Sequence, residues 1–274
     1  MSCSSPANRA RRIRRLVLGF SIASAHVGTV LAAGAPIDPV TEHDQCVMMA
    51  FETDPHGALE RARQWSKQGG GLPADHCAAV ALYELKQYRE AAQAFDKLAA
   101  AMAKETPTGR ASVYDQAGQA WLVADNPRQA KSDFDTALRL DADNPDLLID
   151  RAESLAALHQ YWDAIDDLNR ASDLAPQQPE IYAYRAAAYR AVDSLDLARE
   201  DIAHNLKLAP NNPVGLLERG NIRSIDGDVA GARQDWLLVA KVAPDSPSAA
   251  AANVNLTHLS TAGADKPART GAKN

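Results

Sequence analysis

Hydrophobic positions along this chain follow a helical pattern. Runs of β-branched residues that alternate strictly between apolar and polar positions are absent from the sequence, and such alternation is the signature of half-buried strands. Alanine dominates the apolar residues, and alanine has the highest helix propensity of all residue types. The pattern therefore predicts an all-α protein.

The same pattern returns every 34 residues in the second half of the chain. Four sets of residues keep this step: bulky apolar residues (Phe134, Leu168, Ile202, Trp236), alanines (Ala130, Ala164, Ala198, Ala232), small residues (Gly118, Ala152, Ala186, Gly220) and prolines (Pro145, Pro179, Pro213, Pro247). A fixed period of 20 to 50 residues is typical of stacked repeat architectures. We therefore expect an array of similar units.

Each unit is predicted to contain two helices. Pro179 suits the first turn of a helix, where its missing N–H costs nothing, and this helix is expected to run to about Val192. Asp193 and Ser194 interrupt the pattern, and Leu195 begins a second helix that runs to Leu208. The small residue of the first helix and the alanine of the second allow the two backbones to approach closely.

The unit that starts at Ala111 resembles the tetratricopeptide-repeat family. The alternation of aromatic residues with small residues in that family is matched by Tyr114, Gly118, Trp121, Ala130, Phe134 and Ala137. The resemblance implies a right-handed α-solenoid of about six helix-turn-helix repeats with a C-terminal capping helix. It also implies that the protein binds other proteins and is not an enzyme.

The repeat pattern divides the chain into six segments. A terminal helix is expected because arrays of this kind need a cap over the apolar face of the last unit. The predicted segments are a signal peptide at 1–35, a degenerate first repeat at 36–71, a repeat with a short insertion at 72–110, four repeats at 111–246, a capping helix at 247–259 and a disordered tail at 260–274.

The first 35 residues have the features of an export signal. Five arginines between Arg9 and Arg15 precede an uncharged run from Leu16 to Ala35 that ends in small residues, an order typical of secretory signal peptides. Cleavage after Ala33 or Ala35 would change the formal net charge from −6 to −11. We expect a periplasmic or secreted protein of a bacterium. The alternative is an uncleaved helix that anchors the chain in the inner membrane.

The acidic charge of the remaining chain bears on its partners. Nucleic acids and anionic lipid surfaces need basic patches, so neither is an expected partner. The sequence contains no phosphate loop, dinucleotide-binding fingerprint, nucleophile elbow or helical zinc motif, the patterns that mark common catalytic sites. We therefore predict no enzymatic activity, no cofactor, no bound metal and no small-molecule substrate.

Two cysteines remain after the signal peptide, Cys46 and Cys77, on the first helices of neighbouring repeats. In an oxidising compartment they are expected to form a disulfide, which closes a 32-residue loop and contributes roughly 3.5 kcal/mol of stability. A zinc site with His43 and His76 is the alternative, although adjacent side chains point about 100° apart on a helix. Free thiols are the third possibility.

Arginines and aspartates also follow the 34-residue step. We interpret them as structural ion pairs, although arginine could instead bind a carboxylate or phosphate of a ligand. The sequence leaves open whether each arginine pairs within its own unit or with the preceding one. The residues are Arg151, Arg185 and Arg219 on first helices and Asp133, Asp167, Asp201 and Asp235 on second helices.

The family resemblance implies a concave groove, lined by first helices, that accepts an extended segment or a helix of a partner protein. Its acidic middle favours a basic or amphipathic partner segment. The predicted function is a scaffold or adaptor in the cell envelope; the alternative is an accessory subunit of an envelope enzyme or assembly complex. The candidate groove residues are Asp115, Gln119, Ile149, Asp150, Glu153, Tyr184, Arg190, Leu217 and Asn221.

Overall fold

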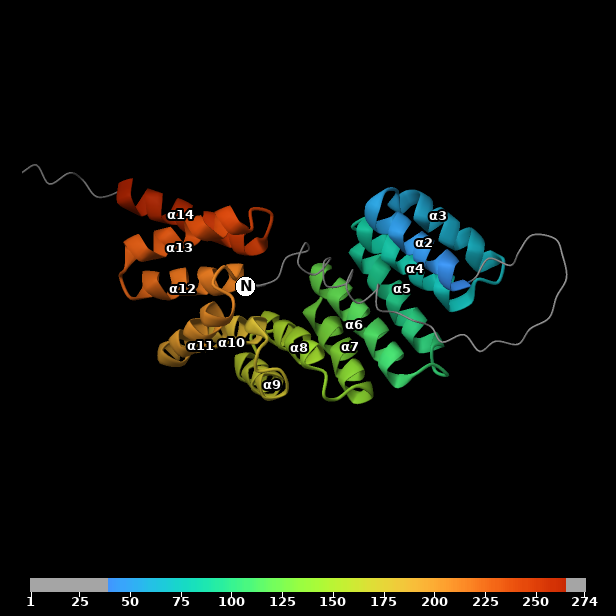
Figure 1. Ribbon diagram of the computed structural model, residues 1–274, viewed down its shortest axis with the longest axis horizontal. Coiled ribbons are helices and arrows are strands. Elements are labelled where there is room, and N and C mark those ends of the chain that lie inside the picture. The colour runs from blue at the N-terminus through green and yellow to red at the C-terminus, as the bar shows by residue number, and fades with distance from the viewer. Residues whose placement is uncertain (1–38, 265–274) are drawn as a thin grey trace, which may run out of the picture. The chain divides into compact units, whose positions relative to one another are not determined.

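A computed structural model of the protein describes residues 39–264 (Figure 1). This part of the chain contains helices and turns but no strand. The helices are α2 (Pro39–Glu52), α3 (Pro55–Lys67), α4 (Gly71–Glu84), α5 (Tyr88–Ala101), α6 (Pro107–Val123), α7 (Pro127–Leu140), α8 (Pro145–Ala157), α9 (Tyr161–Leu174), α10 (Pro179–Ala191), α11 (Leu195–Leu208), α12 (Pro213–Ile225), α13 (Val229–Val242) and α14 (Pro247–Ala264).

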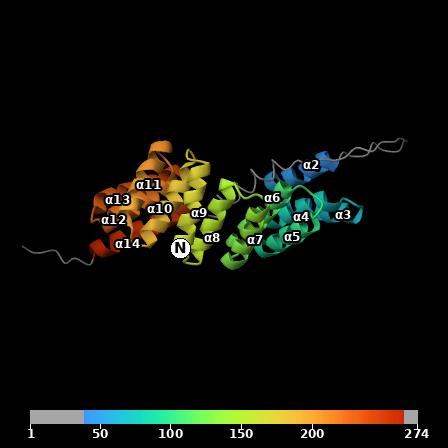
Figure 2. The same cartoon turned by 90° about the horizontal axis from the view of Figure 1, so that it is seen from below.

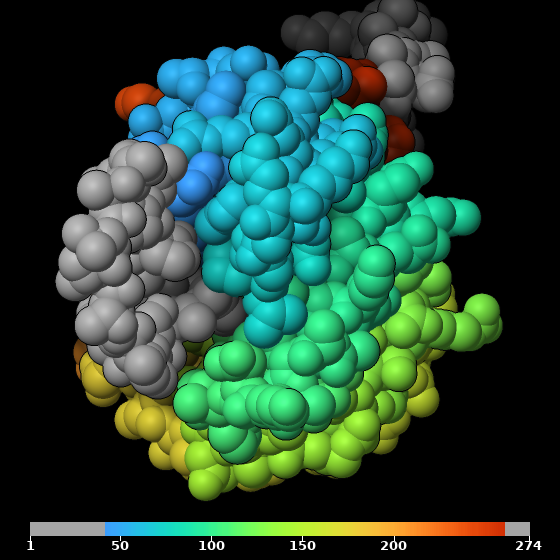
Figure 3. Space-filling view, turned by 90° about the vertical axis from the view of Figure 1, so that its right-hand side faces the viewer, coloured from blue at the N-terminus to red at the C-terminus, as the bar shows by residue number. Residues whose placement is uncertain are grey.

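The helices form two compact units that divide between Gln160 and Tyr161. Helices α2–α8 form the N-terminal unit and α9–α14 form the C-terminal unit. Within each unit, successive helices pack side by side (Figure 2). At the N-terminal end of the described residues, α2 and α3 both pack against α4 (blue to cyan in Figure 3). The predicted all-α array of helix-turn-helix repeats is confirmed.

The predicted signal peptide and the alternative membrane anchor lie outside the described residues. Within residues 39–264, no helix is both long enough and apolar enough to span a bilayer.

Prolines and asparagines set where the first helices begin. Helices α8, α10, α12 and α14 all start at a proline, 34 residues apart. The side chain of Asn144 accepts hydrogen bonds from the amides of Asp146 and Leu147 at 3.1 and 3.4 Å. Asn212 caps α12 in the same way. Such caps satisfy amides that have no partner inside the helix, so the starts of α8 and α12 are encoded locally.

The turn inside each repeat has its own 34-residue register. Asp125, His159 and Asp193 have φ values of 58°, 61° and 61°, and Gly227 has 84°. A residue in this left-handed region commonly ends a helix. Because aspartate, histidine and glycine all occur at this position, no single recurring residue marks it in the sequence.

Small and large side chains face each other inside the repeats. A Cβ atom at Gly118 would lie 2.6 Å from the ring of Phe134, and one at Gly220 would lie 2.6 Å from Nε1 of Trp236. Where the first helix carries Ala186, the facing residue is the smaller Ile202, and the two share one cluster of buried residues. Glycine thus occupies this position of the first helix where the facing residue is an aromatic ring, and alanine occupies it where the facing residue is the smaller isoleucine.

Gly118→Ala is expected to destabilise the N-terminal unit by about 1–3 kcal/mol, because the added methyl group overlaps a ring that is fully buried. The double variant Gly118→Ala/Phe134→Ile reproduces the pairing at Ala186 and Ile202 and should recover most of that loss. Urea unfolding followed by circular dichroism measures both. Equal losses in the single and double variants would contradict this packing.

Two helix boundaries differ from the sequence prediction. Helix α6 begins at Pro107, 38 residues before α8, so the predicted insertion through Arg110 forms an additional first turn of this helix. The reason is a cap: Oγ1 of Thr106 accepts a hydrogen bond from the amide of Gly109 at 3.1 Å. Helix α14 continues to Ala264, past the predicted end at 259. No proline follows Pro247 within it, and the hydroxyl of Ser260 donates to the carbonyl of Thr257 at 2.7 Å.

Candidate functional site

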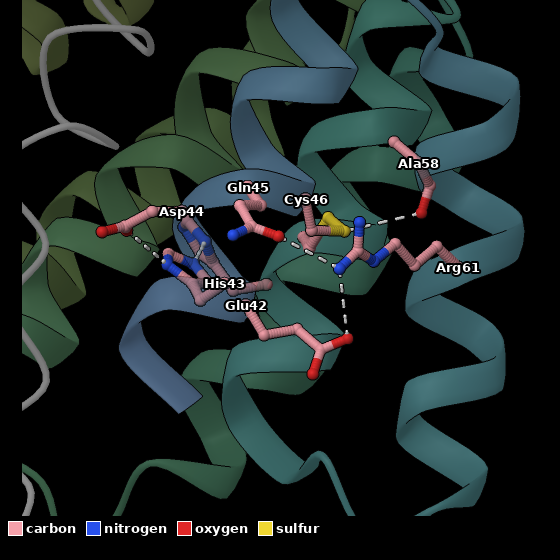
Figure 4. Close-up of a disulfide and its surroundings, with 9 residues drawn as sticks. Glu42, His43, Asp44, Gln45, Cys46, Ala58 and Arg61 are labelled. Carbon is pink, nitrogen blue, oxygen red and sulfur yellow. Dashed lines mark hydrogen bonds and ion pairs between the residues drawn. A yellow bond between two sulfur atoms is a disulfide. The ribbon is translucent and has the colours of Figure 1, made fainter. Parts of the chain in front are cut away.

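A disulfide joins the first helices of the two N-terminal repeats. Cys46 on α2 and Cys77 on α4 are bonded, with a Cα–Cα distance of 6.0 Å, and both are fully buried (Figure 4). Arg61 on α3 donates hydrogen bonds to Glu42 and Gln45 on α2 beside this bond. Helix α2 is therefore held covalently to α4 and by polar contacts to α3.

Two histidines continue this connection into the next repeat. His43 Nε2 lies 2.9 Å from His76 Nδ1, and His76 Nε2 lies 3.0 Å from Oε1 of Gln116 on α6. Burial, reinforced by the charge that His43 can carry, lowers the pKa of His76 to about 3. Burial also lowers the pKa of His43. At neutral pH the two rings are uncharged and form part of a buried hydrogen-bonded chain from α2 to α6.

The described residues of this region do not provide the ligands that a zinc site needs. The two sulfur atoms are bonded to each other, and within the described part of the chain no three or more histidine, cysteine, aspartate or glutamate side chains are grouped to hold a metal ion.

Two of the candidate arginines pair with aspartates of their own repeat. Arg185 on α10 donates to both carboxylate oxygens of Asp201 on α11, at 2.7 and 2.8 Å. Arg219 on α12 makes the same bidentate hydrogen bonds to Asp235 on α13, at 2.7 and 3.0 Å. Each aspartate follows its arginine by 16 residues, so these pairs tie the two helices of one repeat together.

Of the remaining members of the candidate ladder, Arg151 contacts Asp135, with an N–O distance of 2.9 Å, and Asp167 is buried on α9. Asp133 departs from the scheme of the two pairs. Asp133 lies against Asp96 of α5 and not against an arginine. The reason is visible in the sequence: the residue 16 positions before Asp133 is alanine, so no guanidinium is available there.

Asp133, which is buried, and Asp96, which is half-buried, form a pair of carboxyl groups. Trp121 Nε1 donates to one oxygen of Asp96 at 2.9 Å, and Gln129 donates to one oxygen of Asp133 at 3.3 Å. Burial and the neighbouring Asp96 carboxylate raise the pKa of Asp133 to about 8, and burial raises the pKa of Asp96. Two carboxyl groups in contact cannot both ionise cheaply, so the pair holds one proton at neutral pH.

This pair should make the stability of the protein fall with rising pH. The folded-state pKa of Asp133 lies above the unfolded value of about 3.9, so the folded protein binds the proton more tightly. The stabilisation is full below about pH 4 and is lost as the pH rises through about 8. Asp133→Asn removes the titrating group, and its stability relative to wild type should improve by at least about 1 kcal/mol between pH 5 and pH 8.5.

Urea unfolding at the two pH values tests this expectation, with Asp135→Asn as the control. Burial alone would raise the pKa of Asp135, but hydrogen bonds from Lys131 and Arg151 lower it overall. Asp135 is thus ionised at both pH values, and its substitution should change stability equally at both. A pH dependence that is the same in wild type and in Asp133→Asn would refute the shared proton.

Three of the candidate groove residues, Asp115 and Gln119 of α6 and Asp150 of α8, lie together in a buried acidic cluster, which we call the acidic pocket. Nε2 of Gln119 donates to the Asp115 carboxylate at 3.2 Å and to the Asp150 carboxylate at 3.1 Å. The three residues are at most 3% exposed. No described residue offers a hydrogen-bond donor to Oε1 of Gln119, although this atom is buried. Ile149 and Glu153 of α8 are buried as well.

The other candidate groove residues lie in the C-terminal unit and take part in its packing. Arg190 of α10 donates to Glu218 of α12 at 2.6 Å. Asn221 donates to Glu218 at 3.2 Å and accepts hydrogen bonds from Trp236 and Asn255. Tyr184 is half-buried and Leu217 is buried. The amide of Asn221 therefore takes part in contacts within the C-terminal unit.

Glu218, Trp236 and Asn255 were not among the predicted site residues. A signal for one of them was present, because Asn255 follows Asn221 by 34 residues. Identical residues at the same position of successive units can contact each other. Here Nδ2 of Asn255 donates a hydrogen bond to Oδ1 of Asn221 at 2.9 Å.

Comparisons with known proteins agree on the architecture. No family model matches the chain, and no curated protein matches it in sequence. Among solved structures, a tetratricopeptide repeat protein from Parabacteroides merdae ATCC 43184 is 16% identical, with a TM-score of 0.60 over 76% of this chain and 80% of that one. MamA 41-end from Desulfovibrio magneticus RS-1 is 15% identical, with a TM-score of 0.54 over 62% of this chain and 95% of that one.

At this level of identity the similarity concerns the fold. This similarity and the 34-residue step of the helix starts show that the chain has the fold of a tetratricopeptide-repeat protein.

Proposed function

We propose that this protein is a non-enzymatic interaction scaffold or adaptor in the cell envelope, and that its first helices bind a basic segment of a partner protein. The observation that carries the proposal is the acidic pocket. Two carboxylates meet there on one amide group, and all three side chains are buried. Two carboxylates this close together create a negative local potential, which favours a positively charged group nearby.

The orientation of Gln119 indicates what kind of group the pocket accepts. Its N–H groups face the two carboxylates, and the reversed amide would place its oxygen against negative charge. Oε1 is therefore an acceptor that needs a donor. A ligand that donates a hydrogen bond to Oε1 beside these two carboxylates would carry N–H groups and positive charge, as a guanidinium or an ammonium group does. A partner carboxylate would be repelled.

Binding should be tested with protein collected from the periplasm of expressing cells. We expect a fluorescent arginine-rich peptide to bind, and acidic or uncharged peptides of equal length not to bind. Asp115→Asn/Asp150→Asn keeps the shape of both side chains and should weaken binding at least about 10-fold, because it removes both charges. Fluorescence anisotropy at low and high salt measures the affinities.

The matched control is Glu60→Gln/Glu90→Gln, which removes two exposed carboxylates from the same unit and should leave binding nearly unchanged. Equal binding by the pocket variant and the control variant would move the binding site elsewhere. Thermal melting of each variant shows whether it is folded.

The envelope location is supported by two features. The N-terminal residues have the order of a signal peptide, and the disulfide is of a kind that persists in oxidising compartments. After export, intact-mass measurement should find a chain that begins at Gly34 or Pro36. A membrane-bound chain that retains its N-terminal residues would instead support the anchored alternative.

A further inference from the structure

We infer that the C-terminal unit binds a small carboxylic acid with an apolar body, in a cavity between α11 and α12. The cavity has a volume of about 390 Å³, and pockets for small molecules usually measure roughly 300 to 1,000 Å³. This site is separate from the acidic pocket, and the inference does not depend on the proposed function. The walls combine apolar and basic side chains, among them Ile202, Leu206, Ile222, Arg199, Arg219 and Arg223.

Two earlier repeats show how the arginine of the 34-residue step is satisfied. In each, the residue 16 positions before the arginine accepts a hydrogen bond from its Nη1 group. Asp135 accepts from Arg151 at 2.9 Å. Asn169 accepts from Arg185 at 3.0 Å, and Ser172 accepts from the same group at 3.0 Å. In both repeats an oxygen atom of the preceding helix therefore faces Nη1.

Arg219 in the next repeat has no such partner. The residues 16 and 13 positions before it are Ala203 and Leu206, whose side chains carry no hydrogen-bond acceptor. Nε and Nη2 of Arg219 donate to Asp235, and no described residue accepts a hydrogen bond from Nη1. The two apolar residues also line the cavity. A ligand oxygen in the cavity would thus take the place that protein oxygens fill in the two earlier repeats.

The guanidinium groups beside the cavity favour an anion. Asp235 is buried and lies 2.7 Å from Nη2 of Arg219 and 2.8 Å from Nη1 of Arg223, so one buried carboxylate serves two guanidinium groups. Asp228 also lies 3.8 Å from Nε of Arg223, but its side chain is 53% exposed, and solvent weakens such a pair. A carboxylate matches a guanidinium group in both charge and geometry.

The third arginine of the cavity is already neutralised. Arg199 of α11 donates two hydrogen bonds to Asp226 of α12, at 2.6 and 3.3 Å. It also contacts Asp196, whose side chain is almost fully exposed. Recognition of the acid therefore depends on Arg219 and Arg223.

The apolar walls indicate what the carboxylate is attached to. Ile202 and Ile222 belong to one buried cluster, and Leu206 packs against it. A peptide segment would bring backbone N–H and C=O groups that need partners, and these side chains offer none. An alkyl or aromatic group has no such need and gains free energy when it leaves water. The sequence predicted no small-molecule substrate, and the acid inferred here is a ligand that is bound but not chemically changed.

Titration of the full chain with octanoate tests the inference. Octanol has a similar apolar chain without the charge, and acetate has the charge without the chain. We expect octanoate to bind at least about 10-fold more tightly than either. Isothermal titration calorimetry measures the affinities, and the methyl NMR signals of Ile202, Leu206 and Ile222 show where the ligand lies.

Ala203→Asn supplies the acceptor that Asn169 provides one repeat earlier. Ala203 is exposed, so the fold should tolerate the change, while the new amide oxygen competes with the ligand for Nη1 of Arg219. Octanoate should then bind at least about 10-fold more weakly. The matched control is Ala251→Asn, at an exposed position of α14 outside the cavity, and it should leave the affinity unchanged. Arg219→Lys keeps the positive charge but removes Nη1, and it should also weaken binding.

Several outcomes would overturn the inference. One is that octanoate binds Ala203→Asn and Arg219→Lys as tightly as wild type, with thermal melting showing that both are folded. Another is that octanol binds as tightly as octanoate, since the arginines would then have no role. A peptide that ends in leucine and binds the cavity when octanoate does not would show that the occupant is a polypeptide. Asp115→Asn/Asp150→Asn should leave octanoate binding unchanged, so failure of the proposed function and failure of this inference are distinguishable.

Discussion

Arg185→Met is expected to destabilise the C-terminal unit by about 3–5 kcal/mol. The side chains of Arg185 and Asp201 are only 14% and 9% exposed, and Arg185 also donates to Asn169 and Ser172. Removing the guanidinium leaves a carboxylate that is buried without its charge partner, and losses of this size are typical of such cases. Urea unfolding measured by circular dichroism gives the free energy of unfolding.

Two controls distinguish charge burial from lost packing. Arg185→Met/Asp201→Leu removes both charges and should recover most of the stability, because apolar side chains can replace a buried ion pair at little cost. Arg199→Met breaks the pair with Asp226, whose two side chains are each 41% exposed, and should have little effect. A double variant as unstable as the single variant would show that packing, and not the unpaired carboxylate, causes the loss.

Loss of the disulfide is expected to destabilise the N-terminal repeats by about 3.5 kcal/mol, as cross-links over loops of this length do. Helix α2 packs mainly on α3 and α4 and has no repeat before it within the described residues. Each unit of a repeat array is stabilised by its neighbours, so the terminal helices depend most on the bond. Cys46→Ala/Cys77→Ala should therefore lose amide protection in α2 and α3 first.

Hydrogen exchange measured by mass spectrometry resolves this effect by segment. Cys3→Ser is the control and should change nothing in α2 or α3. In the oxidised protein neither Cys46 nor Cys77 should react with a thiol reagent until a reductant is added. Labelling of both without reduction, or unchanged protection after their replacement, would contradict a stabilising disulfide.

The sequence was most informative about features that repeat. Because every unit packs on neighbours of the same design, core positions such as Phe134 and Trp236 recur at the same step, and the helix starts follow from prolines at that step. The longer α6 and α14 could not be read from the period, since local capping at Thr106 and the absence of a helix breaker after Pro247 decide those boundaries.

The candidate site was less predictable because it depends on contacts between repeats. The family resemblance placed Asp115, Gln119 and Asp150 on first helices, but their meeting on one amide group requires the packing of α6 against α8. Asp133 shares the register of Asp201 and Asp235, yet its environment differs because alanine replaces the arginine. The 34-residue period alone cannot predict that one member of a register has a different environment.

The most direct test of the proposed function is a crystal structure of residues 36–274 with an arginine-rich peptide bound. We expect one guanidinium group within hydrogen-bond distance of the carboxylates of Asp115 and Asp150 and of Oε1 of Gln119. A peptide bound on other helices, with these three side chains arranged as they are without it, would contradict the account.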